Sequence, residues 1–181
     1  MSDAAAPGRN PAAVLIPIYD GPQGPTLILF RRTPGGLHSG QVAFPGGRPE
    51  SADKDLEETA LREAEEELAI PRAAVRVIGR LPVVETVVSN YAIHAFVGRL
   101  TARPELRAQA SEVAVVLEVP LSALMETPEE DWWELPALES GGPARRRLVR
   151  FWPWGEDRIW GATQRMIELL VAAVKEGRLS L

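Results

Sequence analysis

The sequence predicts an α/β domain of the α+β kind, and three observations lead to this class. Apolar segments of strand length, rich in β-branched residues, recur between turn-forming residues. One amphipathic helix, expected near residues 55–69, interrupts the strands, and a second helix closes the chain. The chain of 181 residues has the length of one domain. We expect a flexible tail over residues 1–10 and a single domain over residues 11–181.

The segments before the first helix predict a β-hairpin. Residues 12–19 and 26–32 are apolar strands, and the turn between them, residues 20–25, is rich in glycine and proline. A loop then leads to Gly46 and Gly47, which allow the tight turn expected just before the helical segment.

The pattern after the first helix predicts more strands and two more helices. The clearest strand covers residues 91–100, where alternation sets Ile93 and Ala95 on one face and His94 and Phe96 on the other. The remaining expected elements are strands at 75–79, 81–88 and 115–120, a loop at 101–111, a short helix at 121–124, a hairpin within 129–155 that turns at 139–143, and a helix from 159 onward.

The composition narrows the class of protein. Hydrophobic residues make up 45% and charged residues 25%, the balance of an ordinary globular protein. The net charge of −5 argues against a nucleic-acid surface. Cysteine is absent, which excludes disulfides and thiolate chemistry. No apolar run is long enough to cross a bilayer, and the first residues lack the features of a signal peptide. We therefore expect a cytoplasmic protein without nucleic-acid or membrane partners.

Three carboxylates share one face of the expected helix. Glu63, Glu66 and Glu67 stand at positions i, i+3 and i+4, so their side chains lie about one turn apart. A divalent cation would turn their repulsion into attraction, and oxygen ligands on a rigid helix suit Mg²⁺ or Mn²⁺. The alternative is a solvated acidic face, which is common on surface helices. The neighbouring Arg62 could hold Asp53 or Asp55 and so fix the preceding loop against the helix.

Residues 47–70 resemble the box of the Nudix hydrolase family, G-x5-E-x7-R-E-U-x-E-E-x-G-U, where U is apolar. The second half of the box matches residues 62–70, except that Ala69 replaces glycine. In the first half, the spacing between Gly47 and Arg62 is one residue longer than in the box. The early glutamate of the box is also missing, and Asp53 and Asp55 flank its position.

The longer spacing resembles that of the coenzyme A diphosphatase branch of this family. That branch also has an Asp-x-Asp-like segment, as at residues 53–55, and Thr-Ala-Leu-Arg-Glu-Ala, as at residues 59–64. A further signature of the branch, L-L-T-x-R-[SA]-x3-R-x3-G-x3-F-P-G-G, resembles residues 27–47. This chain departs from that signature at three positions. Leu29 replaces Thr, Arg32 replaces Ser or Ala, and Gly36 replaces Arg.

The resemblance implies a Nudix fold, an α/β/α sandwich with a mixed sheet between helices and the box as a loop–helix–loop. It implies Glu63 and Glu67 as the main ligands of Mg²⁺ or Mn²⁺, and Glu66 as a further ligand or the general base. The backbone of Gly46 or Gly47 would complete the metal site.

Two further residues receive roles from the resemblance. Arg62 would orient the glutamates. Glu112 matches a position outside the box that supplies a ligand or the general base in many Nudix proteins, although a cap of a turn or helix is an alternative reading.

Candidate substrate contacts lie in the loops around the box. Arg31, Arg32 and His38 could contact phosphate, but each could equally be an ordinary surface residue. Gly46 and Tyr91 could also touch substrate. The tryptophan- and arginine-rich segment at 129–155 could stack an adenine, although a plain hairpin with exposed arginines explains its pattern as well.

The resemblance implies hydrolysis of the diphosphate of coenzyme A or its derivatives, giving 3′,5′-ADP and (acyl-)phosphopantetheine. The first alternative is another nucleoside diphosphate-linked substrate, such as ADP-ribose, NADH or a dinucleoside polyphosphate. The second is a non-catalytic Nudix-fold binding protein, against which the complete glutamate set argues. Family habit and the tryptophan segment suggest a homodimer.

Overall fold

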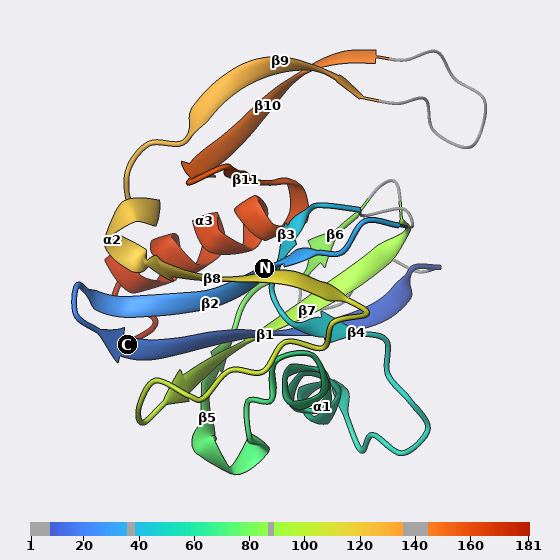
Figure 1. The fold of residues 1–181 in the computed structure, drawn as a ribbon, viewed down its shortest axis with the longest axis vertical. Helices are drawn as coiled ribbons and strands as arrows, with labels where there is room; N and C mark the ends of the chain where they lie inside the picture. The colour runs from blue at the N-terminus through green and yellow to red at the C-terminus, as the bar shows by residue number, and fades with distance from the viewer. Residues whose placement is uncertain (1–7, 36–38, 87–88, 136–144) are drawn as a thin grey trace.

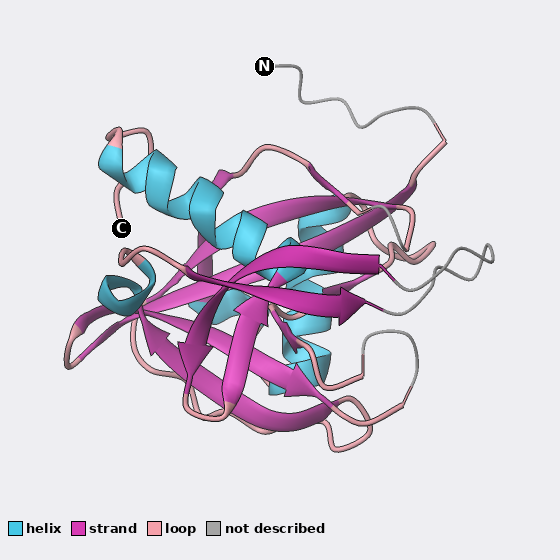
Figure 2. Cartoon of the chain, turned by 90° about the horizontal axis from the view of Figure 1, so that it is seen from above, coloured by secondary structure: helices cyan, strands magenta, loops and turns pink. Residues whose placement is uncertain are grey.

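The protein has a mixed β-sheet with one long helix on each face and a second, smaller sheet beyond one of these helices (Figures 1 and 2). The computed structural model describes residues 8–35, 39–86, 89–135 and 145–181. The predicted α/β/α layering is therefore confirmed, and the smaller sheet is an addition to it. No helix in these described ranges is long and apolar enough to cross a membrane.

The main sheet has eight strands, and parallel pairing of β1 with β7 forms its centre. These two strands pair from Asn10 opposite Tyr91 to Ile18 opposite Arg99. β1 and β2 form the predicted antiparallel hairpin, and β8 pairs with the other side of β2. The strands are β1 (Asn10–Gly21), β2 (Gly24–Arg32), β3 (Val42–Ala43), β4 (Gly46–Gly47), β5 (Val75–Arg80), β6 (Val84–Glu85), β7 (Tyr91–Leu100) and β8 (Val113–Pro120).

The smaller sheet has the order β11–β10–β9, with strands β9 (Glu129–Leu135), β10 (Arg145–Trp154) and β11 (Asp157–Trp160). β9 and β10 form the hairpin predicted for this segment, whose expected turn at 139–143 lies outside the described residues. Trp152 is buried in the core, whereas Trp132 is 55% exposed. The hairpin interpretation is thus confirmed, with its tryptophans divided between core and surface.

Three α-helices complete the fold: α1 (Leu56–Leu68), α2 (Leu121–Leu124) and α3 (Gly161–Lys175), with a 3₁₀ turn, η1 (Arg72–Ala74), after α1. α1 begins where expected because the Asp55 carboxylate accepts a 2.9 Å hydrogen bond from the amide of Glu58. It ends at Ala69, whose φ of 56° is left-handed. Glycine favours that conformation, and glycine is the residue of the family box at this position.

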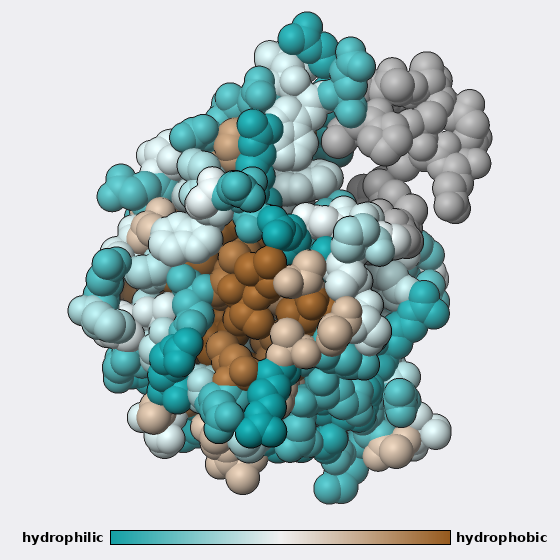
Figure 3. Space-filling model, in the orientation of Figure 1, coloured by the Kyte–Doolittle hydropathy of each residue, from teal (hydrophilic) through white to brown (hydrophobic). Residues whose placement is uncertain are grey.

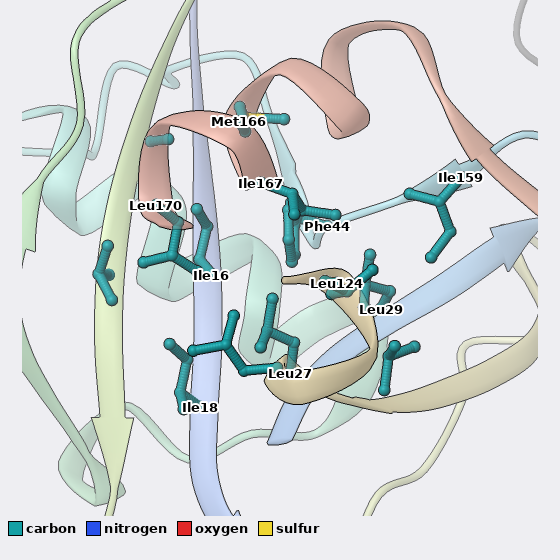
Figure 4. Packing of buried hydrophobic residues seen from close by; sticks show 14 of the residues in the cluster. Ile16, Ile18, Leu27, Leu29, Phe44, Leu124, Ile159, Met166, Ile167 and Leu170 are labelled. Atoms are coloured by element: carbon teal, nitrogen blue, oxygen red, sulfur yellow. The ribbon is translucent and has the colours of Figure 1, made fainter. Parts of the chain in front are cut away.

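Alternation along the strands gives the sheet two apolar faces. Toward α3, Ile16, Leu27 and Leu29 pack with Ile167 and Leu170 of the helix (Figure 4). Toward α1, the cluster is Leu15, Ile28, Phe30, Ala64 and Leu68. Burying each such aliphatic side chain contributes roughly 1.5–3 kcal/mol. The core on the α1 face holds this helix against the sheet, so the polar groups at the rim of α1 keep fixed positions.

Several sequence-based boundaries differ from the structure; the helix expected from residue 159 begins at Gly161, because residues 157–160 form strand β11 and pair with β10. Of the strand expected over residues 81–88, the described part, residues 81–86, contains only β6, and Pro82 before it has no amide proton to pair. The first strand begins at Asn10, one residue inside the expected tail, where it pairs with Tyr91. The strand predicted at 91–100 has the same limits as β7, and its two faces are those expected, since Ala95 and Phe96 belong to opposite cores.

Candidate functional site

The position of α1 divides its three glutamates into different environments. Ala60, Ala64 and Leu68 face the sheet and are buried. Glu67 is next to this stripe and is also buried, whereas Glu63 is half-buried and Glu66 is exposed. The three side chains therefore follow one rim of the helix from the core to solvent, as their spacing predicts.

Glu67 joins α1 to β4. The amide of Gly46 donates a 2.9 Å hydrogen bond to Oε2 of Glu67. Oε1 of the same carboxylate is buried and has no hydrogen-bond partner. Burial raises the pKa of Glu67 to about 8, although the Gly46 hydrogen bond and the charge of Arg32 oppose the increase. An unpartnered buried carboxylate oxygen is costly, and a bound cation would remove that cost.

Glu63 faces the second glycine of the turn. A Cβ atom on Gly47 would stand 2.2 Å from Oε1 of Glu63, so a larger residue there would displace the Glu63 carboxylate. Oε1 of Glu63 lies 3.1 Å from Nη1 of Arg62. Burial raises the pKa of Glu63, and the neighbouring guanidinium opposes this. The predicted proximity of the glycine turn to Glu63 and Glu67 is thus present in the structure.

Arg62 is a buried centre that connects the loop to the helix. Its Nε and Nη2 donate to the Asp53 carboxylate at 3.0 and 3.2 Å, and Nη2 also donates to the carbonyl of Arg48 at 3.0 Å. Nη1 donates to Glu66 at 3.0 Å. Between the two aspartates considered for this partner, the structure places Asp53 on Arg62 and uses Asp55 as the helix cap.

Asp53 is itself fixed by the loop and the helix. Its Oδ2 accepts hydrogen bonds of 2.9 Å from the amide of Glu50 and from the hydroxyl of Thr59. The Arg62 guanidinium, with help from the Glu50 amide, holds the pKa of Asp53 well below its usual range. The loop before α1 is therefore fixed by a hydrogen-bonded ion pair that includes no residue of the glutamate rim.

Glu112 reaches the same site through the loop between β7 and β8. The amide of Gln109 donates to the carbonyl of Glu67 at 2.9 Å, and the amide of Glu112 donates to the carbonyl of Gln109 at 2.9 Å. The charge of Glu112 affects the pKa of both Glu63 and Glu67. The loop thus packs against the end of α1 and brings Glu112 near the glutamate rim. A role for Glu112 at the metal site needs this proximity.

The two neighbouring arginines of β2 lie on opposite faces of the sheet. Arg32 is on the α1 face, where Nη2 lies 3.6 Å from Glu112 and its charge lowers the pKa of Glu67. Arg31 is on the α3 face and donates a 3.1 Å hydrogen bond to Asp157 of β11. Of this predicted pair, only Arg32 is near the carboxylates. His38 and Gly36 lie outside the described residues.

Tyr91 has a partner that the sequence did not suggest. The guanidinium of Arg48 lies over its ring, 5.2 Å from the centroid. Because the Arg48 carbonyl is held by Arg62, this stacked pair lies beside the loop that carries the two glycines. In the sequence, only the position of Arg48 directly after Gly47 could have indicated that Arg48 stacks on Tyr91 near the site.

The residues at the glutamate rim are of the type that binds a divalent cation, although their carboxylates do not surround a common point. Within the described ranges, no group of three or more Asp, Glu or His side chains is placed to enclose a metal. The reason is local, since Glu63 and Glu66 both contact Nη1 of Arg62. The buried, unpartnered Oε1 of Glu67 and the carboxylate donors beside it are what a hard cation would bind.

Comparison with known proteins identifies the family. The NUDIX domain profile matches residues 9–140. The chain belongs to the Nudix family. Uncharacterized Nudix hydrolase NudL of Yersinia enterocolitica is 39% identical over 165 residues, covering 90% of this chain and 80% of that protein. NudL of Salmonella paratyphi B is 44% identical over 167 residues, covering 92% and 83%.

Solved structures show the same Nudix fold. A MutT/nudix family protein from Enterococcus faecalis matches with a TM-score of 0.59 and 12% identity, covering 95% of this chain and 64% of that one. The NUDIX domain of Shewanella oneidensis NrtR, solved with ADP ribose, matches with a TM-score of 0.51 and 18% identity, covering 64% and 75%. At these identities the likeness concerns the fold alone.

Membership of the Nudix family establishes the reaction class. This chain is a Nudix hydrolase that acts on the diphosphate bond of a nucleoside diphosphate-linked substrate, and hydrolases of this family need divalent metal ions. A metal ion bound at such a site neutralises phosphate charge and acidifies water. The carboxylates of Glu63, Glu66 and Glu67 lie along one rim of α1, where Arg62 contacts Glu63 and Glu66.

Proposed function

We propose that this Nudix hydrolase cleaves the diphosphate of coenzyme A or its derivatives, using Mg²⁺ or Mn²⁺, to give 3′,5′-ADP and (acyl-)phosphopantetheine. The observation that carries its hydrolase part is the buried Glu67 carboxylate, with one oxygen on the Gly46 amide and the other unpartnered. The coenzyme A part rests on the resemblance of residues 27–47 and 53–64 to that branch of the family.

The three departures from the branch signature lie in different places of the fold, so we expect them to affect substrate binding to different extents. Leu29 is fully buried in the core on the α3 side, so its replacement of threonine concerns packing. Arg32 lies among the carboxylates, where it can affect substrate binding. Gly36 is outside the described residues. Of the two departures that the structure describes, Arg32 is therefore the one that can affect substrate preference, while Gly36, where the branch has an arginine, stays the departure that matters most for substrate.

The side chains have distinct tasks under this proposal. Glu63 and Glu67 bind the metal together with the backbone at Gly46 and Gly47, while Arg62 keeps the loop and helix in register. Arg32 contacts a phosphate oxygen of the substrate, for which a charge-assisted hydrogen bond is suited. Glu66 and Glu112, which are both solvent-accessible, are the candidates for the base that accepts a proton from the attacking water.

The test compares substrates under identical conditions. Purified protein is incubated with Mg²⁺ or Mn²⁺ and with coenzyme A, ADP-ribose, NADH or a dinucleoside polyphosphate, each in a separate reaction. Products are separated by chromatography, and kcat/KM is measured for each substrate. We expect coenzyme A to have the highest value and to yield 3′,5′-ADP, with a chelator abolishing the reaction.

The alternatives give different results in the same experiment. If ADP-ribose, NADH or a dinucleoside polyphosphate has the highest kcat/KM and coenzyme A is inert, the metal site is right and the coenzyme A assignment is wrong. If no diphosphate turns over with either metal, although one of them binds, the chain is a Nudix-fold binding protein.

A further inference from the structure

The guanidinium of Arg48 is an unpaired cation beside the glycine turn. Arg48 directly follows Gly47 and is exposed, and no carboxylate of the described residues pairs with it. The other arginines described around the site all have carboxylate partners: Arg9 pairs with Glu85 at 3.0 Å, Arg31 with Asp157 at 3.1 Å, Arg32 with Glu112 at 3.6 Å and Arg62 with Asp53 at 3.0 Å. Arg48 is therefore available for an anionic ligand.

Two contacts hold Arg48 in place without using the donors of its guanidinium. Its carbonyl accepts a 3.0 Å hydrogen bond from Nη2 of Arg62, which fixes the main chain. Its guanidinium lies over the ring of Tyr91, 5.2 Å from the centroid. Tyr91 is itself fixed, because it pairs with Asn10 and its amide donates to the hydroxyl of Thr86 at 2.9 Å. A guanidinium that stacks by its face keeps its in-plane N–H donors free for an acceptor.

Arg48 and the glutamates lie on opposite sides of the glycine turn. A Cβ atom on Gly47 would meet the Glu63 carboxylate, so Gly47 faces the α1 side. Tyr91 shares its face of β7 with Ala95, which belongs to the core on the α3 side, so the stacked guanidinium is on that side. Neighbouring Cα atoms are about 3.8 Å apart. A group attached close to the diphosphate of a bound substrate is therefore within reach of Arg48.

We propose that Arg48 binds a phosphomonoester on the nucleoside part of the substrate, next to the diphosphate that is cleaved. This inference rests on the proposed function, in which the 3′-phosphate of coenzyme A is that group. A guanidinium with free in-plane donors forms two parallel hydrogen bonds to a phosphate. The anchored main chain and the stack on Tyr91 reduce the conformational freedom that Arg48 loses on binding.

Charge favours a phosphate over a nucleobase as the ligand of Arg48. A nucleobase would stack on the open face of the guanidinium and leave its charge and its donors unpaired, whereas a phosphate satisfies both. The chain has a net charge of −5, so a substrate with a further anionic group needs a cation where that group lies. Figure 3 shows a mostly hydrophilic surface over α1 and the loop that precedes it, as suits a solvated phosphate.

Arg158 is a weaker candidate for the same role. It is also exposed, and its guanidinium lies 5.2 Å from the ring centroid of Trp133 and 4.9 Å from that of Phe151. It belongs to β11 of the smaller sheet, however, and not to the turn that contacts the glutamates (Figure 1). A stacked, exposed arginine of the same kind therefore occurs away from the glycine turn, and it provides a matched control.

The first experiment compares two substrates that differ by one phosphate. We measure kcat/KM for coenzyme A and for dephospho-coenzyme A, which lacks the 3′-phosphate, with the wild type, Arg48→Ala, Arg48→Lys and Arg158→Ala. The wild type should prefer coenzyme A roughly ten- to hundredfold, the range of a charge-assisted hydrogen bond. The ratio should fall to near one in Arg48→Ala, and it should keep the wild-type value in Arg158→Ala. Arg48→Lys should give an intermediate ratio, because an ammonium group lacks the planar pair of donors.

Nucleotide binding separates failure of this inference from failure of the proposed function. Calorimetry compares 3′,5′-ADP with AMP, which lacks the 3′-phosphate, for the same four proteins. Tighter binding of 3′,5′-ADP that is lost in Arg48→Ala supports the site even where coenzyme A is not hydrolysed, and then the coenzyme A assignment alone fails.

Three results overturn the inference. The first is a wild type that binds 3′,5′-ADP and AMP equally well. The second is a preference for the 3′-phosphate that survives in Arg48→Ala. The third is a preference that Arg158→Ala removes, which would move the phosphate to the smaller sheet. Melting temperatures near that of the wild type show that the variants are folded.

Discussion

The amide of Gly46 donates to Oε2 of Glu67, and this 2.9 Å hydrogen bond joins positions that are 21 residues apart. It ties the end of the glycine turn to the buried carboxylate of α1. Because Oε1 of Glu67 has no partner, the bond leaves one oxygen aimed into the site with its desolvation uncompensated. This hydrogen bond explains why the Nudix box combines the glycine turn with α1: the turn supplies the amide that orients the Glu67 carboxylate.

Replacing Glu67 tests the metal site. We expect Glu67→Gln to lower kcat by roughly 10²-fold or more, because one anionic ligand is lost where charge develops on phosphate. The melting temperature without metal should not fall, since glutamine has nearly the size of this carboxyl, whose charged form burial disfavours. Glu65→Gln is the control, as Glu65 is exposed on the same helix and bonded to Arg72. Near wild-type turnover in Glu67→Gln would defeat the assignment.

The neighbouring arginines of β2 should behave differently when each is truncated. Arg32→Ala should lower kcat/KM by roughly ten- to hundredfold, the value of one charge-assisted hydrogen bond to phosphate. Arg31→Ala should leave kcat/KM nearly unchanged and lower the melting temperature, because Arg31 is bonded to Asp157 on the other face. Steady-state kinetics and thermal unfolding of both variants check this. The reverse pattern would move the phosphate contact to Arg31.

The end of α1 offers a stabilising substitution. Ala69 has a φ of 56°, a conformation that strains alanine but not glycine. We expect Ala69→Gly to increase the free energy of unfolding by about 0.5–1 kcal/mol in urea denaturation. Asn90→Gly is the control, since Asn90 also has a left-handed φ, of 53°, which asparagine tolerates. An equal or larger gain at Asn90 would mean that strain at Ala69 is not the cause.

Asp53 should make stability depend on pH in the acid range. The Arg62 guanidinium lowers its pKa in the folded protein, so its contribution is complete above the unfolded value of about 3.9. That contribution is lost as pH falls through the lower, folded value. Asp53→Asn should therefore reduce stability at pH 7 and flatten its decline below about pH 4. Denaturation at several pH values measures both effects.

A matched control for Asp53 is the neighbouring helix cap. Asp55→Asn removes a carboxylate from the same loop but keeps an N-cap side chain, so stability at pH 7 should stay near that of the wild type. An unchanged acid profile in Asp53→Asn would show that the ion pair with Arg62 does not stabilise the fold.

Local sequence was enough to predict the elements that carry the site. The period of the apolar residues predicted α1, and the helical repeat then put Glu63, Glu66 and Glu67 on one rim, whereas the cap at Asp55 became clear only in the structure. Alternation likewise determined β7 and its two faces. These features depend on residues a few positions apart, so their physical causes can be read directly from the chain.

Tertiary structure decided what depends on distant partners. The sequence could not separate Arg31 from Arg32, because the face of each became clear only when β2 was paired with β3 and β8 and Arg31 was found bonded to Asp157 of β11. It left two partners open for Arg62, and packing of the loop chose Asp53. Burial of Glu67 and exposure of Glu66 follow from the way α1 rests on the sheet, since desolvation is set by the whole fold and not by neighbours in sequence.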